Sequence, residues 1–217
     1  MAKKVVKDFT GDCATVTWNS ELCIHVAECG RAKGDLFLGD RKPWCDPNAA
    51  SNEEILDVVE RCPTGSLSVI FTDPSKIEQG PADNTITVVY GGPLVVRGKL
   101  NIEGAPADAP GLNFRASLCR CGLSKNKPYC DNSHEKSDFN DYGAVGESGE
   151  PLTESGGELD ITLIENGPLR LSGNMRIVAG SGRDAWQGTK TALCRCGLSK
   201  KKPFCDGSHR AAGWLSD

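Results

Sequence analysis

The sequence predicts an α+β protein in which a small α+β region precedes a duplicated, mostly β unit. The duplication is visible in two windows, 118–134 and 193–209, in which 14 of 17 positions are identical. The match continues upstream without a gap, so that Ile86 corresponds to Ile161 and Gly98 to Gly173. Because only two copies exist, a solenoid is not expected. We expect two halves related by a pseudo-two-fold axis.

Each repeated unit begins with a run rich in β-branched residues, at 85–90 and at 159–164. Such runs predict strands. A Gly-Pro turn follows in each unit, and then a second short strand at 94–97 or 169–172. We therefore expect both units to be mostly β.

The N-terminal region, 1–72, has a different pattern, typical of one amphipathic helix packed on a small sheet. Residues 15–18 are predicted to form a strand. Ser51 and Glu54 have capping-box spacing at a helix start, and Pro63 ends the helix. The apolar face of this helix is expected to contain Ile55, Val58, Val59 and Cys62.

Three domains follow from these patterns, with boundaries at 1–72, 84–142 and 158–217. Segments 73–83 and 143–157 are rich in Pro, Gly and Ser. Such composition is typical of connectors.

The composition is that of an ordinary globular protein, with 38% hydrophobic residues and a formal charge of −4. Neither a signal-like apolar run nor about 20 consecutive apolar residues occurs, so we expect a cytoplasmic chain with no membrane segment. In a reducing compartment, the 11 cysteines indicate metal binding or catalysis rather than disulfides. The alternative is a set of inert core thiols, for which scattered positions are expected.

Eight of the possible metal ligands lie in the two repeated windows. Cys119 and Cys121 face the same side of an extended backbone. Cys130 and His134 are one helical turn apart, and Asp131 is positioned to cap that turn. The motif is therefore expected in a loop that runs into a short helical turn. The same spacing recurs at Cys194, Cys196, Cys205 and His209.

Three thiolates and one imidazole suit either zinc or a 2Fe–2S cluster, and the ligand types alone leave both open. A disulfide framework is a further alternative. His134 and His209 recur at the same motif position, which supports a ligand role, whereas His25 has no such support.

The pattern C-x-C-x2-S-x3-P-x-C-D-G-S-H resembles the signature of the CDGSH iron–sulfur family, the mitoNEET-like proteins. The second copy matches at every position, and the first departs at Asn132, where the family has Gly. Asn tolerates left-handed backbone better than most residues, so we expect the site to survive.

The resemblance implies a 2Fe–2S cluster at each motif, held by three Cys and one His in a small β fold that is usually a homodimer. This chain looks like a fused version, which implies a monomer with an internal pseudo-dimer. The residues expected around the ligands are Ser124, Lys125, Asp131, Ser199, Lys200 and Asp206.

The N-terminal cysteines Cys23 and Cys29, followed far downstream by Cys62, resemble the ligands of single-cluster bacterial ferredoxins. The arrangement also resembles a divergent mono-cluster, ferredoxin-like domain found beside CDGSH motifs. Four-ligand ferredoxins have a further Cys where this chain has Val26. Three ligands imply a 3Fe–4S cluster, or a 4Fe–4S cluster completed by another group. The spare thiols are Cys13 and Cys45.

The alternative for this region is that Cys62 is a core residue of the helix face. Cys23 and Cys29 are then incidental, and the domain has kept its fold without a cluster.

Two classes of function fit these motifs. One is an electron carrier, whose partner is a redox protein. The other is a cluster donor or a redox or pH sensor, whose partner is an apo iron–sulfur acceptor. An enzyme is less favoured, because neither a Gly-rich nucleotide loop nor a nucleophile elbow occurs.

Charge is distributed unevenly along the chain. The two motif windows carry +2 and +3, and the rest of the chain carries −9. The positive motifs are expected to favour a reduced cluster and to attract an acidic redox partner. Nucleic-acid binding is not expected of an acidic chain without a recognition motif.

Overall fold

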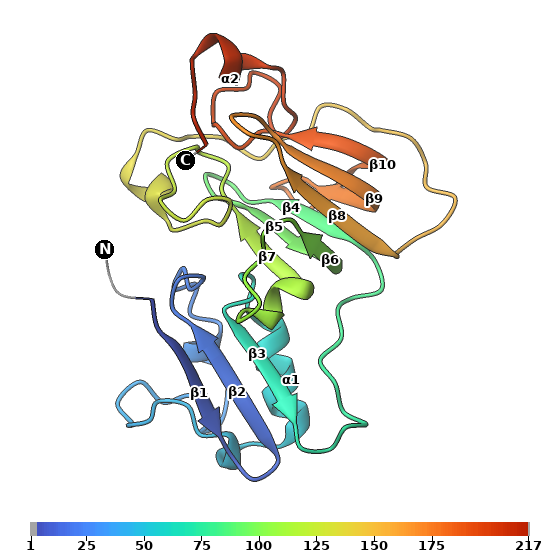
Figure 1. The fold of residues 1–217 in the computed structure, drawn as a ribbon. Helices are drawn as coiled ribbons and strands as arrows, with labels where there is room; N and C mark the ends of the chain where they lie inside the picture. Colours follow the sequence, from blue (N-terminus) through green and yellow to red (C-terminus); the bar gives the residue numbers. More distant parts are fainter. Residues whose placement is uncertain (1–3, 217) are drawn as a thin grey trace.

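The computed structural model describes residues 4–216, so the outer ends of the predicted first and last domains, residues 1–3 and 217, lie outside it. The fold is rich in strands, which form a three-stranded and a seven-stranded sheet (Figure 1). The three-stranded sheet has the order β1-β2-β3 and is antiparallel. Its strands are β1 (Val6–Thr10), β2 (Ala14–Asn19) and β3 (Leu67–Phe71).

The predicted helix packs on this sheet as α1 (Asn52–Arg61). Its capping box between Ser51 and Glu54 is present, and Ile55, Val58 and Val59 are buried as predicted. Cys62 packs against the same core as this face, but it lies one residue beyond the helix. Cys62 is the C-cap, with extended backbone and a partly buried side chain, because the following proline disfavours helical geometry in the residue before it.

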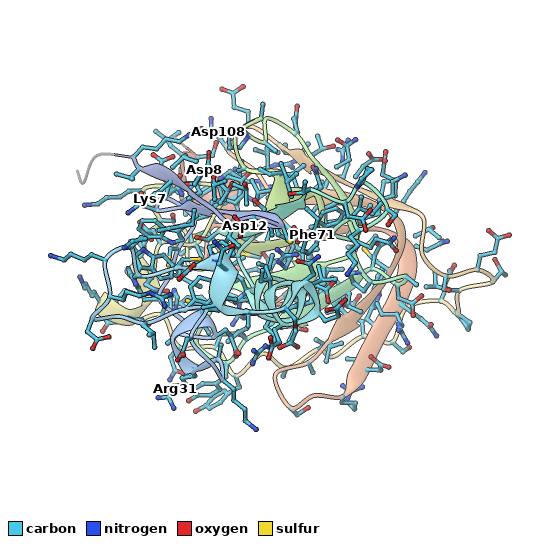
Figure 2. The ribbon with its side chains drawn as sticks, turned by 90° about the horizontal axis from the view of Figure 1, so that it is seen from below. Lys7, Asp8, Asp12, Arg31, Phe71 and Asp108 are labelled. Carbon is cyan, nitrogen blue, oxygen red and sulfur yellow. The ribbon has the colours of Figure 1, made fainter. Side chains whose placement is uncertain are left out.

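Aromatic rings fill the remaining core of the N-terminal region. Trp44 packs against Phe9, Trp18 and Phe37, with ring centroids 5.1 to 5.8 Å apart. Exposed charged side chains cover this end of the molecule, including the labelled residues Lys7, Asp8, Asp12 and Arg31 (Figure 2).

The seven-stranded sheet contains the strands of both repeated units, in the order β6-β8-β9-β4-β5-β7, with β10 paired to β9. The first unit contributes β4 (Thr85–Val88), β5 (Leu94–Arg97), β6 (Lys99–Ile102) and β7 (Arg115–Leu118). The second contributes β8 (Glu158–Leu163), β9 (Leu169–Val178), β10 (Asp184–Leu193) and the short helix α2 (Ser208–Ala211).

Four 3-10 helices complete the secondary structure of the described residues: Cys29–Arg31, Pro47–Ala49, Pro110–Asn113 and Ser133–Lys136. Across residues 4–216, none of the helices has the length and apolar character needed to cross a bilayer.

The two units form one sheet, in which strands of the first unit pair with strands of the second. β4 of the first unit pairs in parallel with β9, which places Ile86 opposite Ile177. β6 pairs in parallel with β8, which places Ile102 opposite Ile161. The repeat relates these two pairings, because Ile86 corresponds to Ile161 and Ile102 corresponds to Ile177. All four isoleucines are buried, so each unit completes the sheet and core of the other.

The N-terminal region packs against the first unit through buried polar contacts. Arg115 on β7 is 2% exposed and forms an ion pair with Glu78, in the connector that follows the N-terminal region. It also donates to the Leu67 carbonyl oxygen at 2.8 Å. Arg97 on β5 donates to the Glu60 carbonyl oxygen, at the end of α1, at 2.7 Å. These contacts place β7 and its loop beside the N-terminal sheet (Figure 1).

Candidate metal centres

The ligand atoms of the first motif form two close pairs. The Sγ atoms of Cys119 and Cys121 are 3.7 Å apart, and Cys130 Sγ lies 3.5 Å from His134 Nδ1. The Cys119 N–H donates to Pro128 O and the Cys130 N–H to Ser117 O, each at 2.8 Å. These bonds fold the loop that follows β7 back onto that strand.

The second motif repeats this arrangement. The Sγ atoms of Cys194 and Cys196 are 3.6 Å apart, and Cys205 Sγ lies 3.5 Å from His209 Nδ1. The predicted pairing of residues along the sequence is therefore present in space in both units. Within residues 4–216, no group of three or more His, Cys, Asp or Glu side chains is set to hold one metal ion.

Hydrogen bonds favour the thiolate of the first cysteine in each motif. The pKa of Cys119 is lowered to about 6 by the hydrogen bond from the Cys121 thiol and by nearby backbone N–H groups. The pKa of Cys194 is lowered to about 6 in the same way, with Cys196 as the donor.

Burial acts in the opposite direction on the third cysteine of each motif. It raises the pKa of Cys130 to about 11 and also raises the pKa of Cys205. The backbone N–H groups of Asn132 and Gly207 partly oppose this by donating to the two sulfurs. Because a thiolate is the ligand form, a bound cation must supply the remaining stabilisation.

The residues predicted around the ligands shape the loops. The hydroxyl groups of Ser124 and Ser199 donate at 2.6 Å to the carbonyl oxygens of Tyr129 and Phe204. In the first loop, Asp131 accepts from the N–H groups of Lys125 at 2.8 Å and Ser133 at 3.0 Å. The second loop has the same pair of contacts, made by Asp206 with Lys200 and Ser208.

One of these predictions needs correction. Asp131 was expected to cap the helical turn, but the N-cap is Asn132, and Asp131 bonds the turn from one residue earlier. Lys125 and Lys200 shape the site through their backbone N–H groups, while the residues themselves are exposed.

Two buried arginines were not identified from the sequence as site residues. Arg120 and Arg195 are 1% and 4% exposed. Their Nε atoms donate to the Gly92 and Gly167 carbonyl oxygens at 3.0 and 2.9 Å. The guanidinium groups also lie over aromatic rings, those of Phe139 and Trp214. The two arginines hold each ligand loop against the Gly-Pro turn of its own unit. An arginine at the same position of both repeated windows was the sequence signal that could have identified them.

The two motifs meet near the centre of the pseudo-dimer. Cys121 and Cys196 form an antiparallel backbone bridge. Gly122 and Gly197 follow them with φ of 82° and 79°, and a Cβ atom at either position would collide with the facing cysteine carbonyl. Glycine is therefore required at both positions.

The three predicted N-terminal cysteines also come together. Cys23, Cys29 and Cys62 line a pocket of about 240 Å³, the N-terminal pocket, together with apolar groups that include Trp18 and Leu67. The pKa of Cys29 is raised by burial and then by the neighbouring Cys62 and Cys23. This proximity argues against three incidental thiols.

The spare thiols lie elsewhere, because neither Cys13 nor Cys45 is among the described residues that line this pocket. Cys13 is exposed just before β2. Cys45 is 1% exposed in the aromatic core, and burial raises its pKa to about 12. His25, for which no ligand role was predicted, lines the same pocket as the three cysteines.

Side chains of the first motif connect it to the N-terminal pocket. Asn132 donates to the Ile24 carbonyl oxygen at 2.7 Å, and Ser117 donates to the Pro63 carbonyl oxygen at 3.1 Å. Asn132 has a left-handed backbone, with φ of 64°, as expected for the position of the family glycine. A cavity of about 490 Å³ also borders both His25 and His134.

Comparisons with known proteins match two kinds of region in the chain. The family model described as "Iron-binding zinc finger CDGSH type" matches residues 91–135 and 166–210. The model described as "Divergent 4Fe-4S mono-cluster" matches residues 9–72.

Similar proteins include "Uncharacterized protein YjdI" from Escherichia coli strain K12 and from Escherichia coli O157:H7. Each is 36% identical over 59 residues, which cover 27% of this chain and 78% of the relative. No solved structure matches the chain.

Proposed function

This chain belongs to the CDGSH iron-binding family and carries a divergent mono-cluster domain before its two motifs, and on that premise we propose that it is an electron carrier. It is an iron–sulfur protein. In this proposal each CDGSH motif binds a 2Fe–2S cluster, and the N-terminal pocket binds a third cluster of the 3Fe–4S or 4Fe–4S type.

The pairing of ligand atoms is the observation that carries the assignment of two irons to each motif. At metal–sulfur bonds of about 2.3 Å, two ligands of one tetrahedral metal are about 3.7 Å apart. The Cys119–Cys121 and Cys130–His134 pairs have spacings of 3.7 and 3.5 Å. Each pair therefore suits one iron of a binuclear cluster, and the second motif has the same two pairs.

A bound 2Fe–2S cluster accepts and returns one electron. The protein surrounds it with cysteines that are almost fully buried, since Cys119, Cys194 and Cys130 are 2%, 1% and 4% exposed. Arg195 and Arg120, the latter paired with Asp141, lie in the same interior. Burial keeps solvent away from the ligands and so opposes their exchange, while nearby positive charge favours the reduced cluster, as an electron carrier requires.

We propose that the partner is an acidic redox protein that binds the second unit. The N-terminal region covers the first unit, and residues 1–72 carry a net charge of −3, from 8 Lys and Arg against 11 Asp and Glu. The equivalent face of the second unit borders a cavity of about 450 Å³. Lys190, Lys201 and Cys205 line it together with the carboxylates of Glu147 and Asp206, and Asp206 is held by the backbone N–H groups of Lys200 and Ser208. Its lysines suit an acidic partner.

The test is electron transfer from the dithionite-reduced chain to an acidic 2Fe–2S ferredoxin, followed by stopped flow over a range of salt concentrations. We expect a rate that falls as salt rises, and a several-fold slower rate for Lys201→Glu. Lys33→Glu, in the N-terminal region, is the charge-matched control. A rate independent of salt and of Lys201 contradicts the proposed docking face, and failure to reduce the acceptor contradicts the carrier function.

Cluster donation or sensing is the second candidate function. It is favoured by His134, which is only partly buried and borders the 490 Å³ cavity. Incubation of the loaded chain with an apo-ferredoxin separates the two functions. A donor loses iron to the acceptor, whereas a carrier keeps its iron through repeated reduction and oxidation.

A further inference from the structure

We propose that His25 is the fourth protein ligand of a 4Fe–4S cluster in the N-terminal pocket. This rests on the proposed function, because it requires that the pocket binds a cluster. Three cysteine thiolates leave one iron of a 4Fe–4S cluster without a protein ligand. The structure identifies the residue that completes the set.

The residues that line the N-terminal pocket leave few candidates for the fourth ligand. Beyond the three cysteines, the described lining residues with an imidazole or a carboxylate are His25 and Glu28. Glu28 already faces a cation, since its carboxylate lies 3.9 Å from Arg61. Val26, at the position of the ferredoxin cysteine, has an apolar side chain that is 50% exposed. His25 is therefore the best remaining donor.

The backbone of the Cys23–Cys29 loop has an uncommon conformation at His25. His25 and Ala27 have φ of 54° and 67°, a left-handed conformation that is uncommon for residues other than glycine. Such conformations persist where surrounding contacts hold them, often at functional sites. Here Ile24 is 8% exposed, and its carbonyl oxygen accepts the hydrogen bond from Asn132. The residue before His25 is thus fixed from outside the loop.

The chemistry of the donor suits the site. A neutral imidazole nitrogen replaces a thiolate as a ligand in other iron–sulfur centres, where it raises the reduction potential. His25 is exposed and lines the same pocket as the three cysteines, so its imidazole can reach a cluster bound there without a change of fold.

The chain holds 3 histidines, which makes a direct test possible. Replacement of His134 and His209 by Cys keeps four ligands at each CDGSH motif and leaves His25 as the single histidine. This variant is produced with isotope-labelled histidine, and the reduced protein is studied by pulsed electron paramagnetic resonance. We expect nitrogen hyperfine coupling on the 4Fe–4S signal, and its absence on an intact N-terminal cluster overturns the assignment of His25.

A second set of variants tests the iron count in the otherwise unchanged chain. The wild-type protein is expected to hold about eight irons, and His25→Ala about seven, with the paramagnetic signal of an oxidised 3Fe–4S cluster. His25→Cys should retain the 4Fe–4S cluster, and Glu28→Gln and Val26→Ala should match the wild type. A 3Fe–4S cluster in the wild type, or an unchanged cluster in His25→Ala, overturns the proposal.

The two proposals fail in different ways. About four irons and no N-terminal signal in the wild type remove the third cluster of the proposed function, and His25 with it. A third cluster that is present but has no nitrogen coupling removes only the role of His25.

Discussion

The two CDGSH units have the same hydrogen bonds within their ligand loops. They have different residues where the first unit contacts the N-terminal region. Arg120, Ser124 and Asp131 have identical counterparts in the second unit, and their hydrogen bonds have nearly the same lengths. The side chains that contact the N-terminal region are not repeated. Arg97, Arg115, Ser117, Asn126 and Asn132 correspond to Ser172, Lys190, Ala192, Lys201 and Gly207.

This difference separates residues that build the ligand loop from residues that contact the N-terminal region. The shared residues build a ligand loop, so they are the same in both copies. The five changed residues each donate a hydrogen bond from the first unit to the N-terminal region, and the second unit has no such neighbour among the described residues. The repeat has thus become one covered unit and one open unit.

The largest expected effect comes from removing one ligand in either unit. Cys119→Ser should release about two irons from the first unit, and Cys194→Ser about two from the second, because a 2Fe–2S cluster needs all four ligands. Iron and sulfide analysis with visible spectra measures the loss. If either variant loses both clusters, the bridge between Cys121 and Cys196 makes the two sites depend on each other.

The next effect distinguishes the covered unit from the open one. Arg115→Ala should lower the free energy of unfolding by about 3–5 kcal/mol, because it leaves the Glu78 carboxylate buried and unpaired. Lys190→Ala, at the equivalent exposed position, should change it by less than about 0.5 kcal/mol. Urea unfolding of the loaded proteins measures both values. Equal effects would contradict the asymmetry of the two units.

Acid should release iron from both CDGSH motifs, and faster from the first. A released imidazole that takes up a proton cannot rebind iron, although burial lowers the pKa of His134. Release therefore rises as pH falls. His134 is partly buried, whereas His209 is 6% exposed. His134→Cys should thus slow the fast phase of colour loss at pH 5, and His209→Cys the slow phase. A single phase unaffected by His134→Cys would contradict this order.

The smallest expected effect concerns the residue that departs from the family signature. Asn132→Gly removes the hydrogen bond to Ile24, worth about 1 kcal/mol, but relieves a left-handed backbone. The net stability should change little, while amide hydrogen exchange near Ile24 should become several-fold faster. Gly207→Asn is the matched control and should leave that exchange unchanged.

The sequence alone predicted much of the site, because its signals are local. Residue spacing paired Cys119 with Cys121 and Cys130 with His134, and the capping box gave the start of α1. The repeat predicted two units, and β4, β5, β8 and the start of β9 lie where strands were predicted, whereas β6, β7 and β10 were not predicted. These features depend on neighbours close along the chain, where backbone geometry fixes which side chains meet.

Only the tertiary structure determined how these parts combine. The sequence did not indicate that β4 pairs with β9 and β6 with β8, nor that His25 shares a pocket with the distant Cys62. It marked Asn132 as a departure from the signature, and the fold supplied the reason in the carbonyl of Ile24. Such contacts join segments far apart in the chain, and they follow from the packing of whole sheets, which no local pattern encodes.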